Sequence, residues 1–157
     1  EWHMIGHLQR NKAKAAVDLF SLIQSLDSLE LARALDREGK KRGRVVRVFV
    51  EINLAGEPTK SGIGKAELVE LLEGIGGLSN LRVEGLMTVP PFHENPEETR
   101  PYFRVLKELQ GSLAGLKIPN VQLRELSMGM THDYPVAIEE GATMVRIGTA
   151  IFGERRG

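Results

Sequence analysis

Leu126-Ser127-Met128-Gly129-Met130-Thr131-His132-Asp133 and, a little further on, Met144-Val145-Arg146-Ile147-Gly148-Thr149 are the stretches that decide the fold. Each follows or contains a short apolar strand and passes into small or hydroxylated residues. The first stretch turns from that strand into the start of a helix. Such a turn presents backbone N–H groups and the positive end of a helix to an anion. Two neighbouring strand ends of this kind predict one phosphate site, as found after the last two strands of a (β/α)8 barrel.

The rest of the chain alternates between predicted strands and helices. The segment 44–54 carries almost continuous β-branched residues, which indicates a strand buried on both faces of a parallel sheet. The segment 97–113 places apolar residues at helical spacing and predicts an amphipathic helix. About six strand–helix repeats predict a parallel sheet with helices outside it. Strands are expected over 2–7, 22–26, 44–54, 81–88, 121–126 and 144–148, and helices over 11–20, from Asp27, over 65–73, 97–113 and 134–140.

Two architectures compete for this pattern. A doubly wound open sheet accepts six strands, whereas a (β/α)8 barrel needs two more. The Gly-rich dinucleotide fingerprint expected after an early strand is absent, and the anion-type turns follow the last two strands. We therefore expect a (β/α)8 TIM-type barrel whose first two strands are missing from this chain. The start at Glu1-Trp2, without an initiator methionine and apparently inside a strand, agrees with a fragment, and residues 1–157 form a single partial barrel domain in this interpretation.

Composition excludes several partners. The 21 basic and 21 acidic residues balance, so nucleic acid and membrane surfaces are poor candidates. The chain has no cysteine, which removes disulfides and thiolate metal sites and suits a cytoplasmic protein. His3 and His7 alternate on a predicted strand without a third ligand, so no metal site is expected. No extra apolar seam is visible, and we expect a monomer.

Several uncommon strings run through the chain in one order, and together they are similar to a known family. They comprise Trp2-His3-Met4-Ile5-Gly6-His7-Leu8-Gln9 with Asn11-Lys12, Glu51-Ile52-Asn53 with Gly56-Glu57 and Lys60, Gly85-Leu86-Met87-Thr88, Leu126-Ser127-Met128-Gly129-Met130 with Asp133, and Val145-Arg146-Ile147-Gly148-Thr149 with Ile151-Phe152-Gly153. By these segments the chain resembles the YggS/PROSC family of pyridoxal phosphate homeostasis proteins. The resemblance extends from the first residue to the last.

The resemblance implies a barrel like the alanine racemase N-terminal domain, holding pyridoxal 5′-phosphate (PLP). Arg146 would face the pyridine nitrogen; because a guanidinium stays protonated, it would leave that nitrogen unprotonated. The phosphate would be held by Ser127, Met128, Gly129, Gly148 and Thr149. The ring pocket would be lined by His3, Asn53, Met87 and Met130.

The family's cofactor lysine belongs to the first strand, which would lie upstream of residue 1. No lysine of this chain takes that place, since Lys12 and Lys14 fall on a predicted helix and Lys60 on a predicted loop. As written, the chain can anchor a phosphate but lacks the amine that would hold the aldehyde.

Three functions stay open on the sequence. The resemblance favours a PLP carrier without catalytic turnover, with PLP-dependent apoenzymes as possible recipients. A PLP-dependent amino-acid racemase is the enzyme alternative, but Tyr102 and Tyr134, the only tyrosines, fall on or beside outer helices. The third is a PLP-free barrel fragment that binds only phosphate or sulfate. Without the resemblance, the hydroxyls of Ser127 and Thr149 could serve only to bond backbone groups at the strand ends. Arg146 could likewise serve only as a partner in an ion pair.

Overall fold

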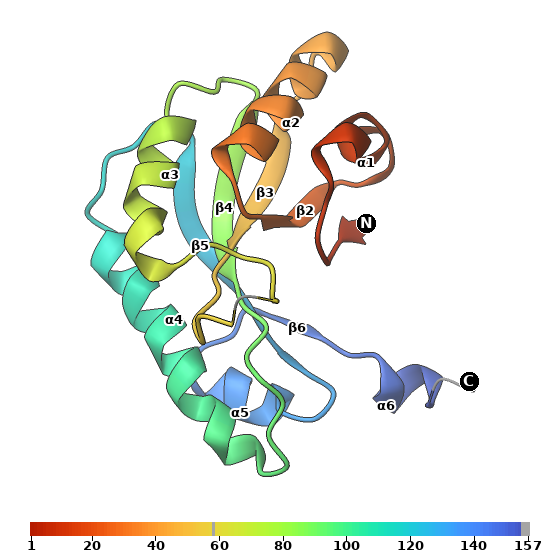
Figure 1. Cartoon of the computed structure of the whole chain (residues 1–157), viewed down its shortest axis with the longest axis vertical. Coiled ribbons are helices and arrows are strands. Elements are labelled where there is room, and N and C mark those ends of the chain that lie inside the picture. The colour runs from red at the N-terminus through yellow and green to blue at the C-terminus, as the bar shows by residue number, and fades with distance from the viewer. Residues whose placement is uncertain (58, 155–157) are drawn as a thin grey trace.

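A curved parallel sheet forms the centre of the computed structural model, which describes residues 1–57 and 59–154. Within those residues the strand order is β1-β2-β3-β4-β5-β6, and each strand pairs in parallel with its neighbours in sequence. The result is an α/β half-barrel (Figure 1). The strands are β1 (His3–Met4), β2 (Leu22–Leu26), β3 (Val46–Glu51), β4 (Leu81–Met87), β5 (Val121–Met130) and β6 (Met144–Arg146). The helices are α1 (Ala13–Leu19), α2 (Leu29–Arg42), α3 (Leu68–Ile75), α4 (Arg100–Leu113), α5 (Tyr134–Glu139) and α6 (Thr149–Phe152), with 3-10 turns η1 (Arg10–Lys12), η2 (Lys65–Glu67) and η3 (Pro96–Thr99).

The helices pack on the outer face of the sheet, as the alternation of elements predicts. Alternate residues of the central strands, such as Val48 and Val50, point into a large outer core with the buried faces of α2, α3 and α4. A second, small cluster lies on the inner face and contains Leu22, Phe49 and Met87 with Met144 packed against it. In Figure 1, α6 stands apart from the body of the fold. The inner face is therefore the surface on which polar strand residues meet.

Several predicted boundaries are shorter in the structure. β1, β3 and β6 each cover only part of the predicted segments 2–7, 44–54 and 144–148. The helix predicted from Asp27 is instead capped by Ser28, whose Oγ accepts the N–H of Leu31 at 3.3 Å. Pro58, inside the predicted loop 55–64, lies outside the described residues, as do residues 155–157.

The prediction for the stretch Leu126–Asp133 is wrong in one respect. The strand expected to end at Leu126 continues to Met130, so Ser127, Met128 and Gly129 are strand residues and not a turn. The turn follows at residues 131–133, before α5. Small residues suggested a turn, but pairing of β5 with β4 and β6 keeps this part of the chain extended. Successive side chains of this segment therefore point alternately to the inner face of the sheet and to the outer core beneath the helices.

An ion-pair network fixes α5 beside the end of β5. Arg100, at the start of α4, contacts Glu97 (2.7 Å), Glu139 (2.6 Å) and Glu140 (2.9 Å). Arg104, one turn later, contacts Glu140 at 3.1 Å. Networks of several charges hold geometry better than isolated surface pairs do. This network ties α4 to the end of α5, the helix that packs against Gly129.

Candidate functional site

A buried chain of hydrogen bonds crosses the inner face of the half-barrel. Ser127 of β5 is fully buried, and its Oγ donates to Oε1 of Gln24 on β2 at 2.6 Å. The same Oγ accepts a hydrogen bond from Arg146 of β6 at 2.6 Å. Gln24 in turn donates to Nδ1 of His3 at 3.1 Å and contacts the Met144 sulfur at 3.0 Å. The sheet is curved enough for side chains from β1, β2, β5 and β6 to form one network.

Arg146 provides the positive charge of this network. Besides Ser127, it donates to the backbone carbonyl of Thr88, just after β4, at 2.8 Å. Burial lowers the pKa of Arg146, and the nearby carboxylates of Glu51 and Asp133 oppose that shift. A guanidinium nevertheless remains charged in proteins. Arg146 is thus a fixed cation held between the ends of β4 and β5.

Glu51, the last residue of β3, provides a negative group on the same face. Its side chain is buried, and its Oε2 atom has no hydrogen-bond partner among the described residues. Burial raises the pKa of the Glu51 carboxyl, and the charge of Asp27 raises it further, whereas Arg146 and His7 lower it. Asp27 itself contacts Nδ1 of His7 at 3.1 Å. A buried acceptor without a partner is a costly feature that needs an explanation.

We expect Glu51→Gln to raise the free energy of unfolding at neutral pH by about 1–2 kcal/mol, since an unpartnered buried charge is removed. The raised pKa means that the folded state holds this proton more tightly than the unfolded chain does. The carboxyl therefore favours folding below the ordinary glutamate pKa, and this contribution is lost as pH rises through the raised value. Urea unfolding at several pH values should show a gain for the variant that shrinks as pH falls. A gain that does not change with pH would contradict this explanation.

A cavity of about 680 Å³ lies beyond the carboxyl ends of β4, β5 and β6. Its walls are largely apolar, with Val89, Pro90, Pro91 and Phe92 on one side and Phe152 of α6 among the others. Cavities of this size and character are typical of sites for small ligands. The polar residues that line it are Lys60, His93, Thr99, Thr131, His132, Asp133 and Thr149.

Two backbone donors converge on one oxygen at the edge of this cavity. Oγ1 of Thr131 accepts the N–H of Gly148 at 3.1 Å and that of Ala150 at 3.5 Å. These contacts join the segment after β5 to the segment after β6. An oxygen held by backbone N–H groups from such a segment occupies the position that an anionic oxygen would favour.

The structure divides the predicted site residues into three groups, whose ligand-binding roles stay predictions. His3, Met87, Ser127 and Arg146 are brought together on the inner face. Met130, Gly148 and Thr149 line the cavity. Three others have structural surroundings: Met128 packs in the outer core, Gly129 lies against α5, and Asn53 exchanges hydrogen bonds with the backbone of Glu57 (2.8 and 3.2 Å).

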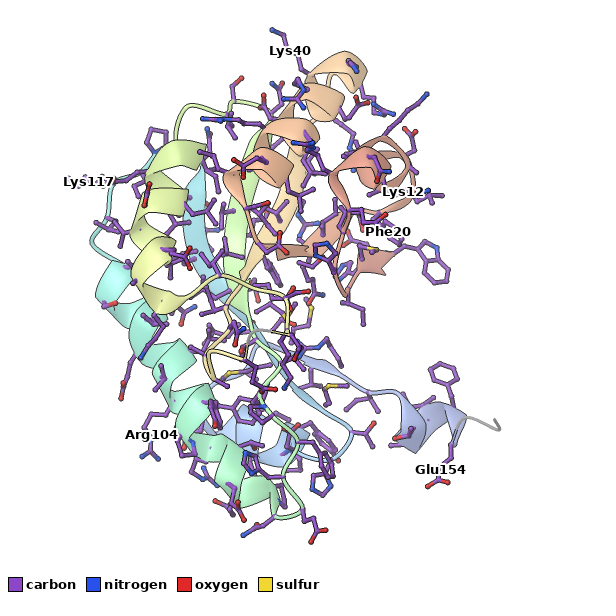
Figure 2. The ribbon with its side chains drawn as sticks, viewed as in Figure 1. Lys12, Phe20, Lys40, Arg104, Lys117 and Glu154 are labelled. Atoms are coloured by element: carbon purple, nitrogen blue, oxygen red, sulfur yellow. The ribbon has the colours of Figure 1, made fainter. Side chains whose placement is uncertain are left out.

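Several residues of the site were not predicted from the sequence. Glu51 and Thr131 occur in the quoted segments but were given no role there. The alternation of side chains along the strand would have placed Glu51 on the inner face. Gln24 gave no signal, because its partner Ser127 is 103 residues away in sequence. Lys60 lines the cavity, whereas Lys12 lies beside α1, well away from α5 and α6 (Figure 2).

In residues 1–57 and 59–154, no group of three or more histidine, cysteine, aspartate or glutamate side chains is arranged to hold a metal ion. Across the same residues, no helix has the length and apolar character needed to cross a membrane.

The parallel half-barrel has a ligand-sized cavity and anion-type donors beyond its last strands, which places the chain among domains of the alanine racemase N-terminal type. The family model described as alanine racemase, N-terminal domain, matches residues 1–156. An alanine racemase from Clostridium difficile 630 in complex with cycloserine has the same fold, with a TM-score of 0.71 and 20% identity, over 99% of this chain and 42% of the racemase chain. At that identity the likeness concerns the fold alone.

Relatives with higher sequence identity identify the family within this class. The pyridoxal phosphate homeostasis protein of Aquifex aeolicus (strain VF5) is 51% identical over 156 residues, 99% of this chain and 68% of the relative. That of Escherichia coli (strain K12) is 40% identical over 156 residues, 99% of this chain and 65% of the relative. The chain thus spans about two thirds of the length of these relatives. It belongs to the family of pyridoxal phosphate homeostasis proteins.

A solved structure agrees with this assignment. PipY of Synechococcus elongatus PCC7942, solved without PLP, has a TM-score of 0.89 and 38% identity over 97% of this chain and 70% of its own. The same protein with PLP bound has a TM-score of 0.88 and 37% identity over the same shares of the two chains. The resemblance seen in the sequence motifs is confirmed.

Proposed function

We propose that this chain binds PLP as part of a homeostasis protein that carries the cofactor without catalytic turnover. One observation carries the proposal: two backbone N–H groups converge on Thr131 Oγ1 in a ligand-sized cavity. The names of the relatives and the PLP bound to PipY give the identity of the anion. PLP-dependent apoenzymes as recipients, a monomeric state and a cytoplasmic location stay predictions.

The donor set fits this cofactor. A phosphate oxygen would replace Thr131 Oγ1 as the acceptor of the backbone N–H groups of Gly148 and Ala150, and the hydroxyls of Thr131 and Thr149 would donate to it, while apolar walls suit the ring. Ser127 would take a different role from the one predicted, since its hydroxyl is engaged by Gln24 and Arg146. It would position the guanidinium rather than contact phosphate. PLP supplies an aldehyde that reacts with amines.

We further propose that the complete barrel contains two parallel strands before β1, the first with the cofactor lysine. Both outer strands of the described sheet, β1 and β6, pair on one side only. Exposed apolar side chains gather at these two ends: Trp2 and Ile5 near β1, and Ile151 and Phe152 on α6. Two added strands would pair with both free edges and remove an aggregation hazard.

The phosphate site is tested by comparing PLP with pyridoxal, which lacks the phosphate. We expect the chain to bind PLP with higher affinity in calorimetry, and inorganic phosphate to compete. The double variant Thr131→Val/Thr149→Val should lose about tenfold or more in PLP affinity, as expected for hydrogen bonds to a charged group. Ser112→Ala, on the surface of α4, is the control and should change nothing. Equal affinity for PLP and pyridoxal would refute the proposed site.

A further inference from the structure

The hydrogen-bond network on the inner face runs in one direction, and Arg146 sets that direction. A guanidinium can only donate, and Arg146 donates to Ser127 Oγ at 2.6 Å. The Ser127 hydroxyl keeps its own proton to give, and the side chain of Gln24 lies 2.6 Å from it. The Gln24 atom at this contact must be the amide oxygen. An N–H group there would leave the proton of the fully buried hydroxyl without an acceptor among the described residues.

The orientation of the Gln24 amide determines which nitrogen of His3 carries the proton. With its oxygen facing Ser127, the amide directs its NH2 group at two acceptors, His3 Nδ1 at 3.1 Å and the Met144 sulfur at 3.0 Å. A neutral imidazole has one N–H group and one acceptor nitrogen. Nδ1 is therefore the acceptor, and the proton of neutral His3 lies on Nε2, which contacts Glu1 Oε2 at 3.5 Å. Gln24 is only 2% exposed, so water cannot replace its contacts.

His3 can exchange protons with solvent, because its side chain is 23% exposed. The charged groups around it come from three strands. Glu1 lies beside Nε2, and Arg47 of β3 contacts the same Glu1 oxygen at 3.4 Å. Arg47 also contacts Glu84 of β4 at 2.8 Å. Arg146 of β6 is the cation at the far end of the network. His3 thus stands between a surface ion-pair group and the buried network.

We propose that Gln24 is a positioning residue that passes a change in the protonation of His3 to the Ser127 hydroxyl and, through it, to Arg146. A second proton on His3 would lie on Nδ1 and face the NH2 group of Gln24, donor against donor, so the amide would turn over. Its NH2 group would then face Ser127 Oγ, which already accepts from Arg146. The hydroxyl proton would lose its acceptor, so the inner face contains a pH-sensitive switch.

The switch acts on the two strands that lead to the anion-type donors. β5 continues from Ser127 to Met130, and β6 ends at Arg146, two residues before Gly148. Oγ1 of Thr131, directly after β5, accepts the N–H of Gly148 at 3.1 Å. Only the effect of the switch on PLP rests on the proposed function. The switch itself can be measured in the chain without a ligand, so either can fail while the other holds.

Nitrogen-15 NMR of the imidazole groups tests the direction of the network. At about pH 9, where an ordinary histidine is neutral, the Nε2–H tautomer of His3 should exceed the other by about tenfold, as expected for one buried hydrogen bond. The signal is assigned by its loss in His3→Gln. Gln24→Glu keeps an oxygen facing Ser127 but places a second oxygen before Nδ1, so the tautomer ratio should reverse. Gln110→Glu, the same change on α4, is the matched control and should leave the ratio unchanged.

A pH titration of the unmodified chain measures the coupling. The guanidinium nitrogen signals of Arg146 should shift with the same midpoint as His3. Glu51 and Asp133 also act on Arg146, so the step that belongs to His3 is identified by its absence in His3→Gln. In Ser127→Ala the middle link is removed, and His3 should still titrate while Arg146 no longer follows it. Thermal unfolding checks that each variant is folded. An Nδ1–H tautomer in the unmodified chain, or Arg146 signals that ignore His3 or still follow it in Ser127→Ala, would overturn the inference.

Discussion

Replacing Arg146 with methionine is expected to lower the free energy of unfolding by about 2–3 kcal/mol. The change removes the donor that holds Ser127 Oγ at 2.6 Å and the carbonyl of Thr88 at 2.8 Å. It also removes the positive charge that acts on Glu51 and Asp133. Methionine fills a similar space, so the loss reports hydrogen bonds and charge more than packing. Urea unfolding at neutral pH measures the difference.

Two other variants separate charge from geometry. Arg146→Lys keeps the charge but cannot donate from a planar fork to two acceptors, so we expect an intermediate loss. Arg82→Met, which removes an exposed arginine 4.0 Å from Glu84, should cost less than about 0.5 kcal/mol. If Arg146→Met were as stable as Arg82→Met, the inner-face network would have no structural role. Under the proposed function, Arg146→Met should also weaken PLP binding.

The fold could be predicted from the sequence because parallel strands and covering helices leave strong local patterns. The apolar β-branched run around β3 and the amphipathic stripe of α4 both occur as expected, with Phe103 and Leu106 fully buried. The family resemblance relied on short strings of residues and is confirmed by the relatives. Such patterns account for the six parallel strands of the half-barrel, whereas the closed barrel proposed above depends on pairing at the edges of β1 and β6.

The site was less predictable, since it depends on pairings between distant strands. Ser127 and Thr131 are four residues apart, yet one is buried in the inner-face network and the other joins two segments at the cavity. The sequence suggests a single phosphate turn there because both are hydroxyl residues near a glycine. Only the register of β5 against β4 and β6 shows that Ser127 points inward. For Gly129 the sequence suggests close approach to phosphate, and the structure adds a second explanation, close approach to α5.

The second explanation predicts that Gly129→Ala lowers the free energy of unfolding by about 3 kcal/mol. Gly129 has a φ of +89°, a conformation that costs an L-residue about 1–2 kcal/mol. A Cβ atom there would lie 2.5 Å from the Cβ of Ala137 and 3.0 Å from Cα of Tyr134, so α5 would have to move. Overpacking of this kind costs about 1–3 kcal/mol more. Denaturant unfolding and the thermal midpoint both report the loss.

A double-mutant cycle tests that the contact with α5 is the cause. Ala137→Gly removes the methyl group that an alanine at residue 129 would meet, although on its own it should cost about 1 kcal/mol of helix propensity. We expect the double variant to be more stable than the sum of the two single changes, because the closer clash is relieved while the contact with Tyr134 and the strained φ remain. Gly111→Ala in α4, where an added Cβ meets nothing within 4 Å, is the control and should stabilise the protein slightly. Strict additivity would show that the Ala137 methyl group does not constrain residue 129 and would contradict this explanation.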